Sequence, residues 1–565
     1  MLSIRKISVI GQRYRHFNRY KKILNVVIKY GFGDLIDRLK IEQYFKIGLK
    51  IVPEEQLHQI QNLTTAERVR KILEELGPTF VKLAQILSTR PDLIPLEYIA
   101  EFTKLQDRVP VFPYEEVVKV IENETGRKPE ELFDKFEPEP YAAASIGQVH
   151  RAVMSDGEEV AVKVQRPGIV KTIEIDLEIM LHLAGLAEQH IKELEQFRPS
   201  RIVAEFARTI EKEIDYNTEA THMEHFARMF INDPTVYVPR VYRELTTERM
   251  LTMEYVEGIK VSEIEALRQA GYNLKEIAGR GAVLIMKQIF EYGFFHADPH
   301  PGNVFILDNN VICYLDFGMM GRISLMEREQ FAELLMRVVN REEKKAAEIF
   351  LELTDYDEEP DRNLLERDLA DLIDRFLYLP LNEIDTGKLL HQLLHVVSKH
   401  GLSLKPHLYL MMKAMGTVEG IGRRLDADFE IGGHAGPFVK KIQLNRLNPK
   451  RIVGDMMDSG MELLHLLREI PAELRTLVKQ VRDGRAKIQF EHRGLDHMIA
   501  SHEKISNRIV FAIVLAALII GSSLIIHSDI PPRLGGIPVI GLFGFLVAGL
   551  MGFWLLISIL RSGRM

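Results

Sequence analysis

Cysteine is almost missing from this 565-residue chain. Cys313 is the only one, which excludes disulfides within the chain and metal sites built from several cysteines. The apolar neighbours Val311, Ile312 and Leu315 predict that Cys313 is a buried strand residue and not a reactive thiol.

A large net charge is missing as well. The formal net charge of -7 at pH 7 is small for this length, and nothing in the composition favours a nucleic-acid partner. The chain contains no internal repeat and no low-complexity tract. Its N-terminus has basic residues but no apolar run followed by a small-residue cleavage site, so we expect no secretory signal. The length exceeds that of a single domain, roughly 100–200 residues, and predicts two lobes with additional segments.

Positive charge gathers in residues 1–50, between Ile, Val, Leu and Tyr side chains. This pattern is typical of a basic amphipathic segment that lies on an anionic surface, and equally of a solvated helical face. The sequence leaves both interpretations open. The basic residues are Arg5, Lys6, Arg13, Arg15, Arg19, Lys21, Lys22 and Lys29.

Two long apolar runs near the C-terminus are the clearest physical signal. Residues 509–526 and 537–560 are each long enough to cross a hydrocarbon core of about 30 Å as a helix. The Pro- and Gly-containing residues 527–536 predict a tight turn between them, and a soluble core able to bury such a hairpin is not evident. Basic residues flank both runs, so we expect both termini and the soluble part to face the cytoplasm at the inner (plasma) membrane. These residues are Lys504, Arg508, Arg561 and Arg564.

Helical and strand-like patterns follow one another in blocks. A boundary falls at Val109–Pro113, where Pro residues interrupt the helical spacing. The predicted strands are Glu159–Gln165, Arg249–Val256, Asn303–Leu307 and Val311–Leu315. The predicted helical regions are 54–108, 114–125, 173–230, most of the chain from 274 onward, and the charge-laced segment 453–506.

Four residues supply the parts that phosphoryl transfer requires. A cation must contact the phosphates, oxygen ligands must hold Mg²⁺, and a carboxylate must lie near the acceptor. Lys163 lies on an alternating apolar strand, as the last residue of the motif Val-Ala-Val-Lys. Asp298 and Asn303 have the D-x-x-x-x-N spacing of a catalytic loop, and Asp316 begins Asp-Phe-Gly. Each motif alone is weak. Their order along the chain predicts that Lys163 contacts phosphates, Asn303 and Asp316 hold Mg²⁺, and Asp298 is the base.

His296 and His300 lie in the same catalytic-loop segment. They could ligate a transition metal, but histidines of such loops more often orient the backbone through hydrogen bonds. We therefore favour the second interpretation.

An alanine-rich loop, Tyr141–His150, stands where a protein kinase has a glycine-rich loop. Alanine does not readily adopt the positive φ that glycine allows, so we expect a stiffer loop that approaches phosphates differently. Ser145 and Gln148 would add hydrogen-bonding side chains near the nucleotide. The predicted nucleotide-binding residues are Ala142, Ala143, Ala144, Ser145, Ile146, Gly147, Gln148, Val149 and Lys163.

With these motifs the chain resembles the UbiB/ADCK family of atypical kinases, of the bacterial UbiB type, over essentially its whole length. The family's K-x-G-Q motif corresponds to Lys82–Gln85, its E-x-D motif to Glu213–Asp215, and its helical glutamate to Glu219. The resemblance implies that Glu219 pairs with Lys163. It also implies that Lys82 and Gln85, with Glu213 and Asp215, gate the site from an N-terminal extension. Ala84 replaces the family's glycine, a mild change in a helix but an unfavourable one if the backbone there needs a positive φ.

We therefore expect an α+β, two-lobed protein-kinase-like fold with an N-terminal helical extension and a C-terminal transmembrane helical hairpin. The expected segments are 1–50, basic and amphipathic; 51–135, the extension; 136–258, the N-lobe; 259–450, the C-lobe; 451–507, an amphipathic helical linker; and 508–562, two transmembrane helices.

The resemblance also implies a function. It implies a membrane-anchored atypical kinase or ATPase that binds ATP or ADP with Mg²⁺ and supports prenyl-quinone (ubiquinone-type) biosynthesis through ATP-driven handling of lipid precursors. Quinone-biosynthesis enzymes are the expected protein partners, and phosphorylation of proteins in trans is disfavoured. Two alternatives stay open: a small-molecule or lipid kinase, and a nucleotide-sensing scaffold without turnover.

Overall fold

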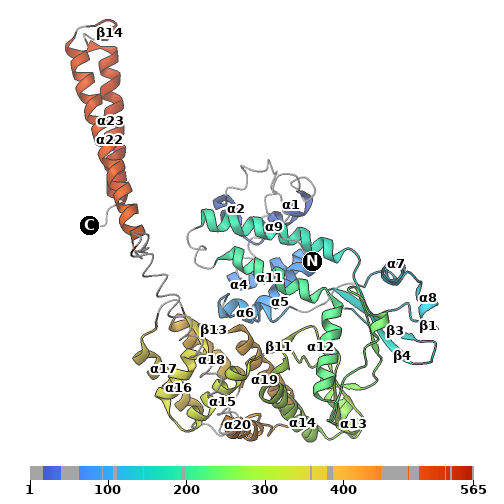
Figure 1. Ribbon diagram of the computed structural model, residues 1–565. Coiled ribbons are helices and arrows are strands. Elements are labelled where there is room, and N and C mark those ends of the chain that lie inside the picture. Colours follow the sequence, from blue (N-terminus) through green and yellow to red (C-terminus); the bar gives the residue numbers. More distant parts are fainter. Residues whose placement is uncertain are drawn as a thin grey trace. The chain divides into compact units, whose positions relative to one another are not determined.

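The computed structural model separates the chain into two compact units, Met1–Val453 and Gly454–Met565 (Figure 1). Of the predicted features, residues 1–16, Ala144, Ser145 and most of the segment 451–507 lie outside the described residues. The residues described are 17–39, 63–91, 93–105, 111–143, 146–191, 198–356, 359–377, 386–446, 482, 495–528, 530–534 and 537–562.

An antiparallel sheet in the first unit has the strand order β1-β3-β4-β6, with β2 paired to β3. The predicted strand at Glu159–Gln165 is confirmed to the residue as β4. Its Val-x-Val-x-Val alternation places Val160, Val162 and Val164 on one fully buried face. The strands are β1 (Lys135–Phe136), β2 (Ala142–Ala143), β3 (Gly147–Val153), β4 (Glu159–Gln165) and β6 (Met250–Glu254).

Two helices cover that valine face. Helix α7 (Tyr114–Thr125) agrees with the predicted helix, and α8 (Pro129–Leu132) follows it. Val117 and Ile121 of α7 are completely buried and belong to the same apolar cluster as the valines. The opposite face of the sheet, which carries Ala161 and Lys163, is thereby left to the rest of the unit.

A separate helical layer has its own apolar core. It joins the N-terminal helices to two helices that follow β4 (Figure 1). Buried residues Tyr20, Ile23 and Leu24 of α1 belong to this core. The protein itself therefore buries the apolar face of α1, and whether its basic side chains meet an anionic surface or solvent stays a prediction. The helices are α1 (Phe17–Lys29), α2 (Gly33–Arg38), α4 (Thr65–Leu76), α5 (Pro78–Leu87), α6 (Leu96–Phe102), α9 (Ile169–His190) and α11 (Pro199–Glu213).

The C-lobe is built around a four-stranded sheet with the order β5-β10-β9-β7 and a two-stranded sheet of β8 and β11. Cys313 is buried in β10, as predicted. The strands are β5 (Val236–Tyr237), β7 (Ile259–Lys260), β8 (Phe294–His296), β9 (Val304–Leu307), β10 (Val311–Tyr314) and β11 (Met320–Arg322). The helices around them are α12 (Tyr216–Met229), α13 (Ile264–Gln269), α14 (Leu274–Met286), the π-helical turn η4 (Lys287–Tyr292) and η5 (Asp308–Asn310). The short helix η3 (Arg243–Leu245) instead contacts β6 of the first sheet.

Within the described residues, a second group of elements, six helices and the paired strands β12 and β13, completes the C-lobe and shares its main apolar core. In this group α19 contacts both α14 and α18. Its members are α15 (Leu325–Val339), α16 (Glu343–Glu352), β12 (Thr354–Tyr356), α17 (Arg362–Leu377), α18 (Thr386–Lys399), β13 (Leu402–Leu404), α19 (Pro406–Leu425) and α20 (Gly432–Arg446).

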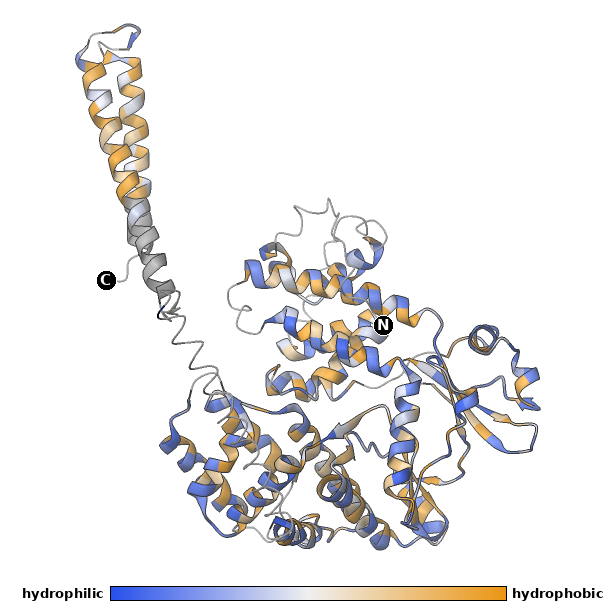
Figure 2. Cartoon of the chain, viewed as in Figure 1, coloured by the Kyte–Doolittle hydropathy of each residue, from blue (hydrophilic) through white to orange (hydrophobic). Residues whose placement is uncertain are grey.

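The second unit consists of two apolar helices that pack against each other, α22 (Leu495–His527) and α23 (Val539–Ser562), joined through β14 (Arg533–Leu534) and β15 (Ile537–Pro538). Figure 2 shows both helices as mostly apolar, whereas helices of the first unit mix apolar and polar residues. Within the described residues, one stretch, Ile509–His527, is long and apolar enough to cross a membrane; the apolar stretch Val539–Leu555 is shorter. The sequence predicts two membrane spans, and in the part of the chain that the structure describes only the first of them is an apolar stretch long enough to cross a membrane.

Candidate active site

Lys163 and Glu219 form the centre of the site. The Nζ of Lys163 lies 2.7 Å and 3.0 Å from the two carboxylate oxygens of Glu219. Both side chains are mostly buried, with exposed fractions of 19% and 7%. Strand β4 supplies the lysine and α12 the glutamate, so this contact fixes the helix against the sheet. The ion pair that the resemblance implied is present.

The charges around Lys163 keep it protonated. Burial works to lower the pKa of Lys163, but the carboxylates of Glu219 and Asp316 outweigh it and raise that pKa. Burial likewise works to raise the pKa of Asp316, but the Lys163 ammonium and the N–H of Gly318 hold that pKa below its ordinary value. A fixed ammonium therefore lies beside an ionised carboxylate, as phosphate and metal binding require.

Asp316 and Asn303 meet at the end of β10. The Nδ2 of Asn303 donates to Oδ2 of Asp316 at 3.3 Å, and Gly318 N donates to Oδ1 at 2.9 Å. The N–H of Leu315 also donates to the Asn303 carbonyl at 3.1 Å. An aspartate carboxylate and an asparagine side-chain amide can each offer an oxygen ligand to Mg²⁺, which completes its shell with water and phosphate oxygens. The residues present therefore fit a magnesium ion.

His296 holds the catalytic loop through its ring. Its Nε2 lies 2.5 Å from the Asp316 carbonyl and its Nδ1 lies 3.3 Å from Asp298 N. Since the carbonyl can only accept, Nε2 carries the proton and Nδ1 accepts. Burial lowers the pKa of His296, which favours this neutral form. His300 Nδ1 accepts from Gly302 N at 3.1 Å, so the predicted backbone role of both histidines is confirmed.

Asp298, the predicted base, lies at the exposed edge of the cluster. Its side chain is 39% exposed, and its Oδ1 lies 3.7 Å from the Nζ of Lys413 on α19. Sequence reasoning did not identify Lys413, because no local motif joins a helix at 406–425 to a loop at 297–303.

The extension approaches the site through a second ion pair. Lys82 on α5 pairs with Glu213 at the end of α11, and both side chains are largely buried. The Lys82 charge also contributes to the low pKa of Asp316, so its ammonium lies near that carboxylate. Gln85 lies one turn further along α5. Asp215 instead caps α12, because its Oδ1 accepts from Asn217 N at 3.0 Å.

Ala84 causes no backbone conflict in this extension. It lies inside α5 and is completely buried, and it is not among the residues with positive φ. Helix α5 starts at Pro78, after Gly77 with φ +99. The backbone conformation that would have made alanine unfavourable is therefore absent.

The alanine-rich loop is described on both sides of Ala144 and Ser145. Ala142 and Ala143 pair with Val149 and Gln148 of β3, and the N–H of Arg166 donates to the Ile146 carbonyl. Val149 lies opposite Lys163 in the sheet and shares its face. A Cβ on Gly147 would come within 2.5 Å of the Val164 carbonyl oxygen, which explains a glycine here.

The prediction for Gln148 is wrong. Its side chain is 1% exposed, accepts from Phe112 N at 3.1 Å, and donates to the Phe112 carbonyl and to Nε2 of His150. Gln148 and His150 share the face of β3 opposite to Val149 and Lys163. Gln148 therefore fixes the segment before α7 and is not available to a nucleotide.

Two further residues of α12 contact the site. The ring of Tyr216 lies under the Lys163 ammonium at 5.1 Å, and its buried hydroxyl has no hydrogen-bond partner among the described residues. The Nδ1 of His222 lies 3.0 Å from the Phe317 carbonyl, so α12 also holds the Asp-Phe-Gly segment. Both residues lie three positions from Glu219, and that spacing is the signal that could have identified them.

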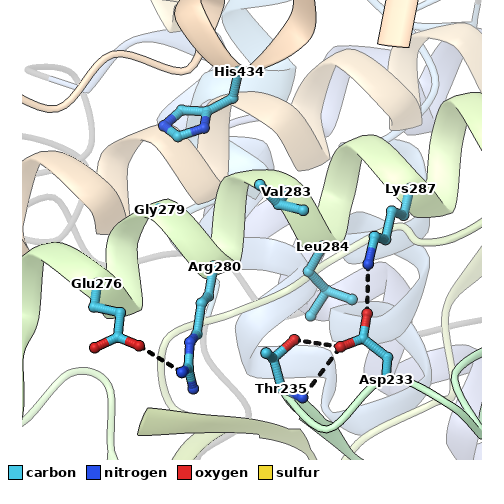
Figure 3. A pocket seen from close by; sticks show the side chains of 9 residues that line it. All are labelled: Asp233, Thr235, Glu276, Gly279, Arg280, Val283, Leu284, Lys287 and His434. Carbon is cyan, nitrogen blue, oxygen red and sulfur yellow. Dashed lines mark hydrogen bonds and ion pairs between the residues drawn. The ribbon is translucent and has the colours of Figure 1, made fainter. Parts of the chain in front are cut away.

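A cavity of about 390 Å³ lies elsewhere in the C-lobe, where α14 and α20 meet the segment before β5 (Figure 3). Its charged residues are paired within the cavity wall: Lys287 with Asp233 at 2.6 Å, and Arg280 with Glu276 at 2.5 Å. None of the predicted site residues lines it.

Comparison with known proteins agrees with the motifs. The ABC1 atypical kinase-like domain matches residues 104–350, the UbiB helical domain 369–430, and the ABC1/UbiB kinase-like C-terminal domain 493–561. A Marinobacter nauticus protein named "Probable protein kinase UbiB" is 32% identical over 470 residues, which cover 82% of this chain and 86% of that protein. The chain belongs to the ABC1/UbiB family of atypical kinase-like proteins.

Two further proteins are similar to this chain. A Clostridium pasteurianum protein named "Uncharacterized protein in hydrogenase 1 5'region" is 33% identical over 547 residues, 97% of this chain and 99% of that protein. A solved structure of a Mycobacterium tuberculosis protein with erythromycin is 25% identical, with a TM-score of 0.46, and covers 66% of this chain and 95% of its own. The match to the ABC1 atypical kinase-like domain confirms the predicted kinase-like fold with mixed helices and sheets. Helix α19, which carries Lys413, falls within the match to the UbiB helical domain.

Proposed function

We propose that this chain is a membrane-anchored, Mg-ATP-dependent atypical kinase or ATPase that supports ubiquinone-type quinone biosynthesis by ATP-driven handling of lipid precursors. The observation that carries the proposal is the cluster of Lys163, Glu219, Asn303 and Asp316. These residues come from β4, α12, the catalytic loop and the end of β10. Lys163 forms an ion pair with Glu219, and Asn303 donates a hydrogen bond to Asp316. A fixed ammonium and a carboxylate with a lowered pKa, next to an asparagine amide, are the groups that binding of Mg²⁺ and phosphate requires.

Each residue has a role in this proposal. Lys163, held by Glu219, binds the phosphates, and Asp316 with Asn303 would hold Mg²⁺, which supplies positive charge against them when bound. Asp298 takes the proton of the acceptor hydroxyl or water. His296 fixes the loop between Asp298 and Asp316 through its two ring nitrogens.

Several observations support the remaining parts of the proposal. Relatives named "Probable protein kinase UbiB" support the link to quinone biosynthesis. The exposed apolar helix α22 supports anchoring in a membrane. The Lys82–Glu213 pair, for which the extension supplies Lys82 near Asp316 and α11 supplies Glu213, supports a gated site that disfavours protein substrates in trans.

The test is Mg²⁺-dependent release of phosphate from ATP by the wild-type chain and by Asp316→Asn, with and without anionic liposomes. We expect turnover in the wild type that rises on liposomes and falls at least about 100-fold in the variant, because one metal ligand is lost. Equal turnover in both proteins would contradict the proposed site.

A second outcome would favour another function. If the wild type binds Mg-ADP in calorimetry but releases no phosphate, the nucleotide-sensing scaffold becomes the better account. A phosphorylated lipid detected by mass spectrometry in membranes with active protein, and not with Asp316→Asn, would favour the lipid kinase.

A further inference from the structure

Three lysines from distant parts of the chain each face one carboxylate of the site. Lys163 pairs with Glu219, Lys82 pairs with Glu213, and Lys413 lies 3.7 Å from Asp298. The first two belong to recognised motifs. Lys413 belongs to none, yet it is the cation closest to the predicted base among the ion pairs of the described residues.

The catalytic loop cannot supply this cation itself. Residues 297–303 read Ala-Asp-Pro-His-Pro-Gly-Asn and contain neither lysine nor arginine. The Nδ1 of His300 already accepts a hydrogen bond from the N–H of Gly302. A cation beside Asp298 must therefore come from another element, and α19 provides it.

Helix α19 is held rigidly enough to place that side chain. Its residues Leu408, Met411 and Ala414 are almost completely buried in the C-lobe core. Tyr409, one turn before Lys413 and on the same face, donates through its hydroxyl to the Ser88 carbonyl at the end of α5, at 3.3 Å. The Lys413 face of α19 thus contacts both the extension and the catalytic loop.

We propose that Lys413 is a positioning residue for phosphoryl transfer, and that it acts by orienting the Asp298 carboxylate. In the step itself the acceptor oxygen bonds to the γ-phosphorus while the bond to the β–γ bridging oxygen breaks. ADP leaves with that electron pair, and Asp298 takes the acceptor proton. Lys413 holds one Asp298 oxygen, which leaves the other directed at the acceptor. This inference rests on the proposed function.

The experiment measures kcat and KM for ATP in Lys413→Met, Lys413→Arg, Asp298→Asn and the double variant Lys413→Met/Asp298→Asn. We expect Lys413→Met to lower kcat about 100-fold, the cost of a misplaced catalytic group, with KM and Mg-ADP affinity within about twofold. Lys413→Arg should recover at least a tenth of the wild-type kcat. In the double variant the lysine change should have no further effect, since its target is already removed.

Lys405→Met is the matched control. Lys405 precedes the same helix and has a similar exposed fraction, 24% against 21%, but its charge faces Glu327. It should keep wild-type kcat. A kcat for Lys413→Met within twofold of wild type, or effects of Lys413→Met and Asp298→Asn that multiply, would overturn the inference while leaving the proposed function intact. A wild type without any turnover would instead contradict the proposed function.

Discussion

His150 is a buried histidine whose two ring nitrogens are both used. Its Nδ1 donates to the Glu137 carbonyl at 2.8 Å, so Nε2 must accept from Gln148 at 2.9 Å. A protonated ring would turn this acceptor into a second donor facing the Gln148 amide. Burial lowers the pKa of His150, in agreement with a neutral ring that is completely buried.

This pKa shift predicts a loss of stability in mild acid. As the pH falls below about 6.5, the unfolded chain takes up a proton at this residue that the folded protein does not, so the free energy of unfolding decreases. His150→Phe removes the effect and should flatten the dependence between pH 7 and 5 by up to about 1.4 kcal/mol per pH unit. Urea unfolding at a series of pH values measures both slopes. Parallel slopes would mean that His150 is protonated equally in both states.

Single residues also show where reasoning from the sequence stops. The alternation Val160–Val164 correctly placed Lys163 on a strand, since every second residue is apolar. The face of Gln148 could not be derived, because a shift of one residue in register reverses every side chain. Only the pairing of Val149 with Lys163 settles that Gln148 faces the other way.

Among the elements, α1 carries a basic residue, Arg19, that the sequence pattern does not distinguish from a solvated one but that holds helices together in the structure. Arg19 donates to both oxygens of Asp176 on α9, at 2.7 and 2.8 Å, and to the Leu76 carbonyl at the end of α4. Asp176 is completely buried. One guanidinium therefore joins three helices of the separate helical layer, α1, α4 and α9.

Arg19→Met should destabilise the chain by about 3–5 kcal/mol, because the Asp176 carboxylate is left buried without a partner. The double variant Arg19→Met/Asp176→Leu should recover much of this loss. Lys29→Met is the control: its pair with Glu75 is 39% and 35% exposed and should cost less than about 1 kcal/mol. Denaturant unfolding in detergent measures all four proteins, and a loss for Arg19→Met as small as that for Lys29→Met would refute the structural role.

Element boundaries were predictable where local chemistry marks them. Pro113 precedes α7 and Gly126, with φ +73, ends it, and the predicted helix agrees to the residue. The break between α11 and α12 carries neither proline nor glycine. In the sequence, only Asp215, the residue that caps α12, marks this break. The break places Glu213 and Glu219 on different helices, so each pairs with a different lysine.

At the scale of the whole molecule, the site combines residues from the extension, both lobes and α19. Local patterns identified Lys163, Asp298, Asn303 and Asp316, and resemblance supplied Lys82 with its partner. The contact of Lys413 with Asp298 was beyond both, because a pairing between distant segments is fixed by tertiary packing and leaves no periodic signal along the chain.

The second unit carries the last prediction. Ile513 and Ile520 of α22 are 63% and 61% exposed, although both are strongly apolar. The inner side of the pair is closely packed: a Cβ on Gly541 would come within 2.6 Å of the Ile526 side chain. Its outer surface is thus apolar and exposed, as the proposed membrane anchor requires. Ile513→Arg/Ile520→Arg should abolish co-flotation with liposomes, since arginine at the centre of a span costs about 2.5–3.5 kcal/mol per residue.

The matched control is Ile513→Leu/Ile520→Leu, which preserves the apolar surface and should float like the wild type. Turnover of the arginine variant in detergent should equal that of the wild type, because both substitutions lie in a unit separate from the site residues. This combination, lost flotation with retained turnover, would assign anchoring to α22 alone. An arginine variant that still floats would show that another part of the chain binds the membrane, and the proposed anchor would have to be abandoned.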